Sequence, residues 1–548
     1  MTDLLPKNMK TKILLLPGLL ALLLSSAVAQ RYVAQGKAMP LRTPNEEALA
    51  NGRLANEGFA RCVRYMNGWL AYADPVSGLI PRNLRESKDY WNAWDAAADN
   101  YPFMVLTASI LSPDIFHRKM LYMLESERSR TSRLGSLPDT YSFSKRNFKN
   151  ALADTSEIIF GSAEYMKDGL IPLTEWLGKS PWSDRMLEIL NDLEKRVRVV
   201  SGMKKDVFGK NSTEEVNGDL LQTLSRMYWF TGERKYLNWA AEIADHYLYE
   251  NHPTKTFESL KIRDHGCEII SGLCEVYLAA SYAWPEKRNQ WKKPIHEMLD
   301  RILEVGRNED GLFYNAINPV TGKIIEGRIA DNWGYTFNAY YFIGELDNIP
   351  AYRAAVLKGL NSLYEKYCGF DWENGSCDGY ADAIEGGINL YNREPIPSLK
   401  DWLDSEIQLM WNYQKPDGII EGWHGDGNFA RTTIMYCLWK TQGILPVPWK
   451  EDLIVGATTT ADGLIIALSS TGGWKGKLKF NSPKYKENMH LPIDYPRINQ
   501  FQNWFTPEGR QKYRLTYDDK SIEVTGSELM EGIPFEVQAG KTIYLRAK

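Results

Sequence analysis

The chain has 548 residues, a formal net charge of −4 and charged residues at 24% of the total. Acidic and basic residues are mixed along it, so the basic stripe of a nucleic-acid-binding protein is missing and no nucleic-acid partner is expected. The length exceeds what one hydrophobic core usually serves, which predicts one large domain and a smaller one.

The first 29 residues have the pattern of a cleavable export signal. Lys7, Lys10 and Lys12 give a positive start, residues 13–24 are apolar, and Ala27-Val28-Ala29 is a small-x-small cleavage site. The apolar run is shorter than the roughly 20 residues of a membrane-spanning helix, so no stable membrane insertion is expected after cleavage. We therefore expect an exported protein, periplasmic or secreted.

Residues 30–445 are dominated by apolar residues at helical spacing. Short polar turns separate the repeats, which is typical of consecutive helical hairpins. The predicted helices cover 213–231, 236–249, 263–282, 294–305, 349–367, 399–413 and 430–442.

A recurring turn supports a repeated hairpin unit. It is present at Ser77-Gly78, Asp168-Gly169, Asp310-Gly311 and Asp417-Gly418. Six or seven hairpins can close into an (α/α) toroid, the mainly α fold that we predict for 30–445. An open solenoid is the alternative, but long loops rich in Trp, Asn, Asp and Gly favour a closed ring with a cleft at one end.

The C-terminal residues 446–548 have a different pattern. Short β-type runs at 453–455, 463–468, 477–480, 513–517, 521–524 and 542–545 are separated by Gly, Pro and Asp turns. A small C-terminal β-sandwich domain is predicted, which packs against the helical ring.

The first candidate site is the segment from Trp91 to Tyr101. If it is helical, Asp95 and Asp99 lie one turn apart on one face, with Asn100 and Trp91 nearby. Carboxylates and an indole in this arrangement suit sugar binding, although carboxylates that bridge loops would give the same pattern.

The second candidate is Asp264-His265 at the start of a predicted helix. Asp264 suits the helix N-cap, and His265 then lies in the first turn, where the helix dipole disfavours the charged imidazole and keeps it available as a base. A structural histidine is the alternative.

Three further segments combine amides, aromatic rings, carboxylates and a guanidinium. They contribute the candidates Asn332, Trp333, Tyr335, Asp382, His424, Asp426 and Arg431. Arg431 lies one turn into a helix and can reach a carboxylate with two hydrogen bonds. None of these segments has metal-ligand spacing or a phosphate-binding loop, so no metal and no cofactor are expected.

The export signal, the hairpin array, the tryptophan-rich loops and the β-rich tail together resemble the secreted (α/α)-toroid enzymes with which gut and marine bacteria degrade uronic-acid polysaccharides. Within that group the chain is most similar to the L-rhamnose-α-1,4-D-glucuronate lyases of arabinogalactan degradation. The resemblance implies a polysaccharide lyase that cleaves at glucuronic acid by β-elimination, with a uronic-acid-containing oligosaccharide or polysaccharide as its partner.

Elimination needs a base for the C5 proton, an acid for the leaving oxygen and donors that neutralise the uronate. We assign these roles to His265, Tyr335 and Arg431. An exo-acting glycoside hydrolase of the β-glucuronidase type is the first alternative, because the candidate segments hold more than the two carboxylates that hydrolysis needs. A non-catalytic glycan-binding protein is the second alternative.

Overall fold

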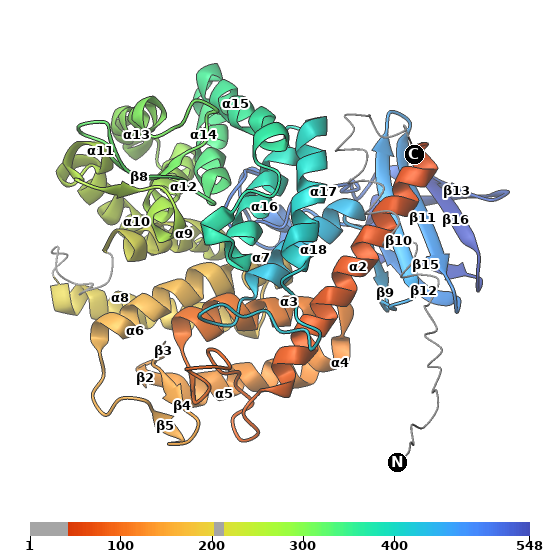
Figure 1. Ribbon diagram of the computed structural model, residues 1–548, viewed down its shortest axis with the longest axis horizontal. Coiled ribbons are helices and arrows are strands. Elements are labelled where there is room, and N and C mark those ends of the chain that lie inside the picture. Colours follow the sequence, from red (N-terminus) through yellow and green to blue (C-terminus); the bar gives the residue numbers. More distant parts are fainter. Residues whose placement is uncertain (1–41, 202–212) are drawn as a thin grey trace, which may run out of the picture.

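The computed structural model describes residues 42–201 and 213–548. The expected export signal lies outside these residues. Helices dominate the described chain up to about residue 440, and strands dominate after it (Figure 1).

Within the described residues, seven helical elements form an inner ring. Each contacts the next, and the seventh contacts the first, so the ring is closed. In chain order they are η1 (Ala93–Asn100) with α3 (Tyr101–Leu111), α6 (Thr155–Glu164) with η3 (Tyr165–Leu170) and α7 (Ile171–Leu177), α9 (Thr213–Thr231), α12 (Glu268–Ala283), α14 (Trp333–Asp347), α16 (Cys377–Tyr391) and α18 (Asn428–Lys440).

Outer helices alternate with the inner ones along the chain. They are α2 (Pro44–Ala71), α5 (Leu121–Thr131), α8 (Pro181–Ser201), α10 (Arg234–Asp245), α13 (Pro285–Val305), α15 (Pro350–Lys366) and α17 (Pro397–Trp411). Five of these outer helices in the described chain begin at a proline, which fits the first turn because no backbone N–H is needed there. The predicted toroid of helical hairpins is thus confirmed, with seven units.

Burial separates the two rings. The inner helix α12 is buried from Glu268 through Ala280 without a break, whereas the outer helix α13 buries a single stripe that includes Trp291, Ile295 and Met298. A helix buried all round needs apolar or small residues on every side, while a surface helix needs only one apolar stripe. The sequence therefore specifies the layer of each helix.

Two sheets form the predicted β-sandwich. The larger has the strand order β10 (Leu453–Thr460), β11 (Gly463–Ser470), β16 (Thr542–Ala547), β13 (Lys512–Tyr517) and β14 (Lys520–Thr525). The smaller has the order β15 (Ile533–Val537), β12 (Trp474–Lys479) and β9 (Leu445–Val447). Both sheets are antiparallel, and their inner faces enclose a separate apolar core.

Helix α2 joins the sandwich to the ring (Figure 1). A Cβ at Gly456 of β10 would lie 2.0 Å from the backbone nitrogen of Gly52 in α2, so the close contact requires glycine. The side chain of Asn51 donates to the carbonyl of Ala457 at 2.9 Å, which fixes the helix against the strand edge.

The chain between β12 and β13 returns to the ring. We call residues 488–503 the plug segment. Its Tyr495 donates to Glu275 of α12 at 2.9 Å, and its Arg497 binds Glu175 of α7. These contacts close the ring at the C-terminal halves of the inner helices, so access is from the opposite end.

The four recurring turns divide into two kinds. Gly78, Gly311 and Gly418 have φ of +71°, +97° and +90°, the left-handed conformation that glycine adopts without strain. Gly169 is different, because it lies inside the π-helix η3 and packs against Pro102. The turn predicted at Asp168-Gly169 is therefore wrong; small size at a helix contact explains this glycine.

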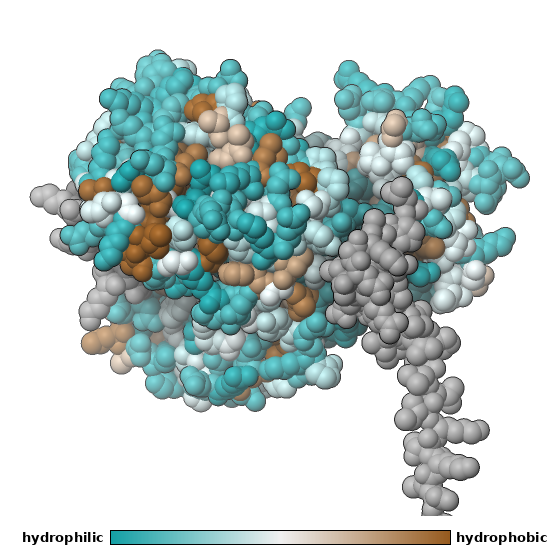
Figure 2. Space-filling model, turned by 45° about the horizontal axis from the view of Figure 1, so that its top comes forward, coloured by the Kyte–Doolittle hydropathy of each residue, from teal (hydrophilic) through white to brown (hydrophobic). Residues whose placement is uncertain are grey.

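The surface in Figure 2 is largely hydrophilic, and its apolar residues form small separate patches. Within residues 42–201 and 213–548, no helix combines the length and the apolar character needed to cross a membrane.

Candidate functional site

We call the N-terminal ends of the inner helices η1, α14, α16 and α18, with their preceding loops, the mouth of the ring. The plug segment lies at the other end, so the mouth is where a ligand can approach the polar interior. Carboxylates from three of these helix starts meet there.

Asp95 and Asp99 lie in η1, which is a π-helix rather than an α-helix. One ligand atom of each and one of His424 lie within 4.8 Å of one another. The Nε2 of His424 is 3.9 Å from Oδ1 of Asp95. π-helical turns are frequent at functional sites because they re-aim side chains within a helix. Asp95 and Asp99 were predicted from one segment and His424 from another, and the structure brings the three together.

The charge of His424 follows from its neighbours. Burial of the imidazole lowers its pKa, but the carboxylates of Asp95, Asp99 and Asp426 outweigh burial and raise the pKa above its ordinary value. His424 thus favours the cationic form among these acids.

A metal ion is a poor fit to this triad, the one such group among the described side chains. Asp95 already accepts hydrogen bonds from Arg82 Nε, at 2.5 Å, and from Asn92.

Asp378, in the first turn of α16, adds a further carboxyl group to the mouth. Its Oδ1 accepts a hydrogen bond from Nδ2 of Asn428 at 2.8 Å. Burial raises its pKa well above the ordinary value, and the negative charges of Asp382, Asp426 and Asp99 raise it further. The group is therefore suited to hold a proton where an ordinary aspartate is ionised.

Asp426 precedes α18 and accepts from the backbone N–H of Asn428 at 3.0 Å. Burial raises its pKa, although the charges of His424 and Arg431 act in the opposite direction. Asp378 and Asp426 thus form a pair of interacting acids beside one helix start, and their protonation is coupled.

Arg431 is buried, and the protein binds both of its terminal nitrogens, whereas its Nε has no hydrogen-bond partner within the described residues. Its Nη2 lies 2.7 Å from Oδ1 of Asp382 and 2.9 Å from Oε2 of Glu385, and its Nη1 donates to Asn428 at 2.9 Å. The guanidinium therefore holds two carboxylates of α16 in place. The clamp on a substrate carboxylate predicted for Arg431 does not fit these contacts.

Tyr335 belongs to the same arrangement. Its hydroxyl lies 2.8 Å from Oδ1 of Asp382 and 2.7 Å from Oε2 of Glu385, and only 3% of the residue is exposed. Burial raises the pKa of the phenol well above its ordinary value. A proton held this firmly does not suit the role of acid to a leaving oxygen, so Tyr335 orients Asp382 instead.

Asn332 completes the set by donating to Oδ2 of Asp382 at 2.7 Å. The carboxylate of Asp382 thus accepts from three side chains and remains 15% exposed. Asn332 and Asp382 were predicted as binding residues from separate segments, and the structure brings them together.

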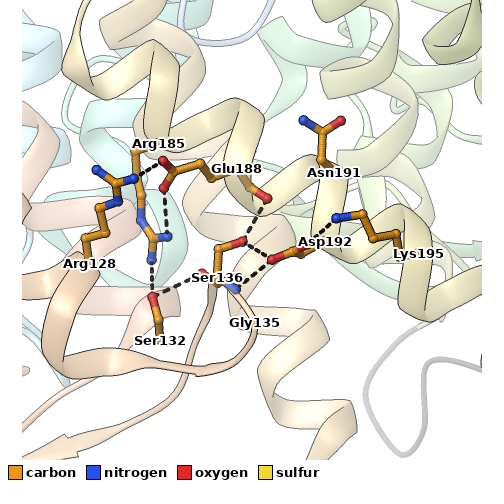
Figure 3. Close-up of a pocket in the computed structure, with 9 residues that line it drawn as sticks. All are labelled: Arg128, Ser132, Gly135, Ser136, Arg185, Glu188, Asn191, Asp192 and Lys195. Carbon is orange, nitrogen blue, oxygen red and sulfur yellow. Dashed lines mark hydrogen bonds and ion pairs between the residues drawn. The ribbon is translucent and has the colours of Figure 1, made fainter.

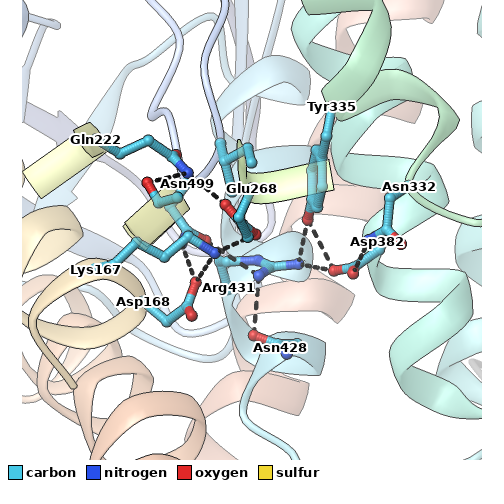
Figure 4. A network of polar contacts seen from close by, with 12 residues as sticks. Lys167, Asp168, Gln222, Glu268, Asn332, Tyr335, Asp382, Asn428, Arg431 and Asn499 are labelled. Atoms are coloured by element: carbon cyan, nitrogen blue, oxygen red, sulfur yellow. Dashed lines mark hydrogen bonds and ion pairs between the residues drawn. The ribbon is translucent and has the colours of Figure 1, made fainter. Parts of the chain in front are cut away.

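Figure 4 shows how Asn499 of the plug segment extends this network. Its backbone N–H donates to Glu385 at 2.6 Å, its Oδ1 accepts from Arg431 at 3.1 Å and its Nδ2 donates to Asp168 at 3.0 Å. Asn499 has φ of +61°, a left-handed conformation uncommon for residues other than glycine. Such strain is typical of positions held by function.

Asp168 leads to a second buried group. Lys167 lies 2.8 Å from Asp168 and 2.5 Å from Glu268, which also accepts from Gln222. Burial lowers the pKa of Lys167, but these two carboxylates raise it well above its ordinary value. One cation therefore joins η3 to α12 across the ring interior.

Other predicted site residues lie where substrate cannot reach them. Trp91 is 2% exposed and Trp333 is 0% exposed, because both indoles pack in the apolar core of the toroid. Asn100 is 0% exposed, and its side-chain oxygen accepts from Tyr65. The stacking role predicted for the two tryptophans is therefore wrong; aromatic core packing explains them.

Asp264 and His265 form part of the 3₁₀ turn Asp264–Cys267 directly before α12. Their side chains lie outside the described residues, so the base predicted at His265 stays a prediction.

Asp378, Asn428 and Asn499 lie in this network but were not among the site residues predicted from sequence. Asp378 and Asn428 lie within the same segments as Asp382 and Arg431, so the signal was present in the motif. Asn499 had no such signal, because it lies in the β-rich tail and reaches Asp168 across 331 positions of the sequence.

Two cavities lie in different parts of the described chain. One of about 340 Å³ lies at the mouth, lined by Arg263, Arg328, Asn315, Asp331 and Glu373 among others. The other, of about 480 Å³, lies between α5, α8 and the β2 (Ser132–Leu134) to β3 (Leu137–Pro138) turn (Figure 3). No element of this larger cavity carries a residue of the mouth.

The sequence matches no protein-family model and no curated protein. Solved structures resemble the chain at low identity. A cellobiose 2-epimerase from Bacillus thermoamylovorans is 14% identical, with a TM-score of 0.38 over 51% of this chain and 87% of its own. An inactive variant of an α-1,6-mannanase from Salegentibacter sp., in complex with α-1,6-mannotetrose, is 11% identical, with a TM-score of 0.41 over 69% of this chain and 97% of its own. An unsaturated glucuronyl hydrolase from Bacillus sp. is 10% identical, with a TM-score of 0.37 over 53% and 86%.

Proposed function

We propose that the protein is a carbohydrate-active enzyme that hydrolyses a glycosidic bond at the mouth of the toroid. The observation that carries the proposal is the raised pKa of Asp378 beside further carboxylates in a partly open polar region. Perturbed acids that converge at an accessible site are typical of catalysis.

Glycoside hydrolysis needs one protonated carboxyl group and one carboxylate on either side of the bond. Asp378 suits the first role, because burial and like charge favour its protonated form. It would protonate the leaving oxygen. Asp99 suits the second role, because it comes from η1, on the other side of α18, and its charge acts on Asp378.

Asp382 differs from this pair in being held by Arg431, Tyr335 and Asn332. These three donors fix the orientation of the carboxylate. We assign Asp382 to sugar hydroxyl binding, in line with its partial exposure, and Arg431 and Tyr335 to its positioning.

β-Elimination at a uronate is the second candidate. It is favoured by Arg263 on the mouth cavity, whose side chain is 32% exposed and lies 3.6 Å from Glu326, and by the position of His265 two residues from Arg263. Arg328, on the same cavity, already binds Asp371 and Asn374. Under elimination, Arg263 takes the clamp role that the contacts of Arg431 exclude.

The two reactions differ in their products. We would incubate the protein with arabinogalactan that carries rhamnose-glucuronate ends, with other glucuronate glycans and with neutral glycans, and measure sugar release and ultraviolet absorbance together. Hydrolysis releases sugar with flat absorbance, whereas elimination creates a conjugated double bond that absorbs. Sugar release with a rise in absorbance would contradict hydrolysis and identify the reaction as elimination. Binding without any release would indicate a glycan-binding protein.

The matched variants are Asp378→Asn and Asp114→Asn. Asp114 lies in α4 (Pro113–Ile115) and is almost fully exposed, so its variant controls for the loss of one carboxylate. We expect Asp378→Asn to abolish release and Asp114→Asn to leave it unchanged. Equal activity in both variants would remove Asp378 from the mechanism.

A further inference from the structure

One tryptophan stands apart from the others. All eighteen lie in the described residues, and among them Trp423 alone has an exposed side chain, at 65%. The other seventeen are buried or half-buried. An exposed indole offers a flat apolar surface that a ligand can cover, with a gain from the apolar area removed from water.

The loop that carries Trp423 is held firmly. Nδ2 of Asn83 donates to the carbonyl of Trp423 at 2.6 Å, and the backbone N–H of Gly425 donates to the carbonyl of Arg82 at 2.7 Å. The side chain of Glu421, which is 2% exposed, accepts from the backbone N–H of Leu84. The loop is thus tied to residues 82–84 on both sides of the indole.

Gly425 seats the loop against the ring. A Cβ there would lie 2.2 Å from Nδ2 of Asn100 and 2.5 Å from the ring of Trp69, so only glycine allows this contact. The backbone under Trp423 is therefore fixed, and ordering the indole on a ligand costs little further entropy.

Trp423 also lies next to the carboxylates of the mouth. Its ring centroid is 6.0 Å from that of His424, whose Nε2 is 3.9 Å from Asp95. A ligand that covers the indole would thus lie close to Asp95 and Asp99, which can accept hydrogen bonds from hydroxyl groups.

We infer that Trp423 is a stacking platform for a pyranose ring of the substrate chain, at a subsite next to the point of cleavage. The apolar C–H face of a pyranose covers an indole, while its hydroxyl groups reach the carboxylates beside it. A protein partner would need a continuous apolar patch of several hundred Å², which a lone indole does not provide. The inference rests on the proposed function and adds to it a binding subsite for one sugar unit of the substrate.

The test uses Trp423→Ala and Trp423→Phe, with Tyr249→Ala as the matched control. Tyr249 is 53% exposed and lies in η4 (His246–Glu250), the continuation of the outer helix α10. With oligosaccharides of increasing length, we expect Trp423→Ala to raise KM about tenfold at unchanged kcat, which corresponds to about 1.4 kcal/mol. We expect a smaller rise for Trp423→Phe and none for Tyr249→Ala. With an aryl monosaccharide, which ends before the subsite, all three should match the wild type.

Binding is measured separately, by tryptophan fluorescence of Asp378→Asn titrated with the same oligosaccharides. We expect the fluorescence of Asp378→Asn to change on titration. We expect no such change for the double variant that also carries Trp423→Phe. This change in the absence of any cleavage by the wild type would leave the subsite standing and overturn the proposed hydrolysis. Normal cleavage with equal KM for Trp423→Ala and wild type would overturn the subsite alone.

Discussion

The two ends of the ring interior use buried charge in opposite ways. At the plug segment two buried arginines each bind a carboxylate with two hydrogen bonds. Arg226 binds Glu275 at 2.9 and 2.6 Å, and Arg497 binds Glu175 at 3.1 and 2.5 Å. All four side chains are at most 2% exposed.

At the mouth, described carboxyl groups outnumber described cations. Two of these acids, Asp378 and Asp426, have raised pKa values, and His424 is drawn toward its cationic form. Removing one partner of a buried matched pair destabilises the fold, because the other charge is left uncompensated, and clustered like charges destabilise it through repulsion. Such clusters are typical of functional sites. We therefore place the reaction at the mouth and assign a structural role to the charged pairs at the plug segment.

The largest expected effect tests the mouth. Asp378→Asn should lower the rate of sugar release roughly 10²- to 10⁴-fold, the range that general acid catalysis contributes. It should leave the thermal midpoint unchanged or raise it, because asparagine is neutral at every pH, whereas Asp378 has to bind a proton on folding to become neutral. A variant that loses stability in proportion to activity would make Asp378 structural, like the plug residues. Activity and thermal unfolding are measured on the same preparation.

The next effect tests the plug. Arg497→Met leaves Glu175 buried without its partner and should lower the free energy of unfolding by about 3 to 5 kcal/mol. Lys512→Met, which breaks an exposed pair with Glu523 in the sandwich, is the control and should not change stability measurably. Denaturant titration gives both values. A loss no larger than that of the control would contradict the structural role of the plug pairs.

A smaller effect separates side-chain contacts from backbone strain at Asn499, which joins the two ends. Asn499→Gly and Asn499→Ala both remove the amide that binds Arg431 and Asp168. Both should lower kcat about tenfold, as the loss of about 1.4 kcal/mol of positioning does. Only Asn499→Ala should also lose roughly 1 kcal/mol of stability, because alanine resists φ of +61°.

The readout that separates positioning from folding is the pH profile of kcat. Asn499→Gly should shift it, since the carboxylates that Asn499 connects change their surroundings, while KM stays near the wild-type value. If Asn499→Gly has the kcat and the pH profile of the wild type, Asn499 has only a structural role in the plug segment.

The smallest effect is a pH dependence of stability. Burial raises the pKa of Glu406 to about 7, so between its unfolded value near 4.3 and that pH the native state holds a proton that the unfolded state has lost. Stability therefore falls as pH rises through this window. Glu406→Gln keeps a neutral side chain at every pH and should flatten the fall, as judged from thermal midpoints between pH 5 and pH 8. An unchanged slope would contradict the shift.

The helical ring was largely predictable, because a period of three to four residues depends only on local sequence. The helix predicted at 213–231 coincides with α9, and the apolar runs of the tail became strands. Asp168-Gly169 was mispredicted, since the same dipeptide serves a left-handed turn elsewhere and a helix contact here.

The site was predictable only in part. Segment composition singled out Asp95, Asp382, His424 and Arg431, which the structure brings into one region, but it could not show that Arg431 is bound by Asp382 and Glu385. Sequence also cannot distinguish the buried Trp333 from the exposed Trp423, because exposure depends on packing between distant elements. Asn499 was not predicted for the same reason.

Dependence on the leaving group tests the central claim most directly. Rates of Asp378→Asn and wild type are compared on two glycosides of the same sugar, one with a poor and one with a good leaving group. If Asp378 is the general acid, the variant loses most of its rate on the first and little on the second, because a good leaving group needs no proton. An equal loss on both substrates, or an unsaturated product from the wild type, would contradict hydrolysis by Asp378.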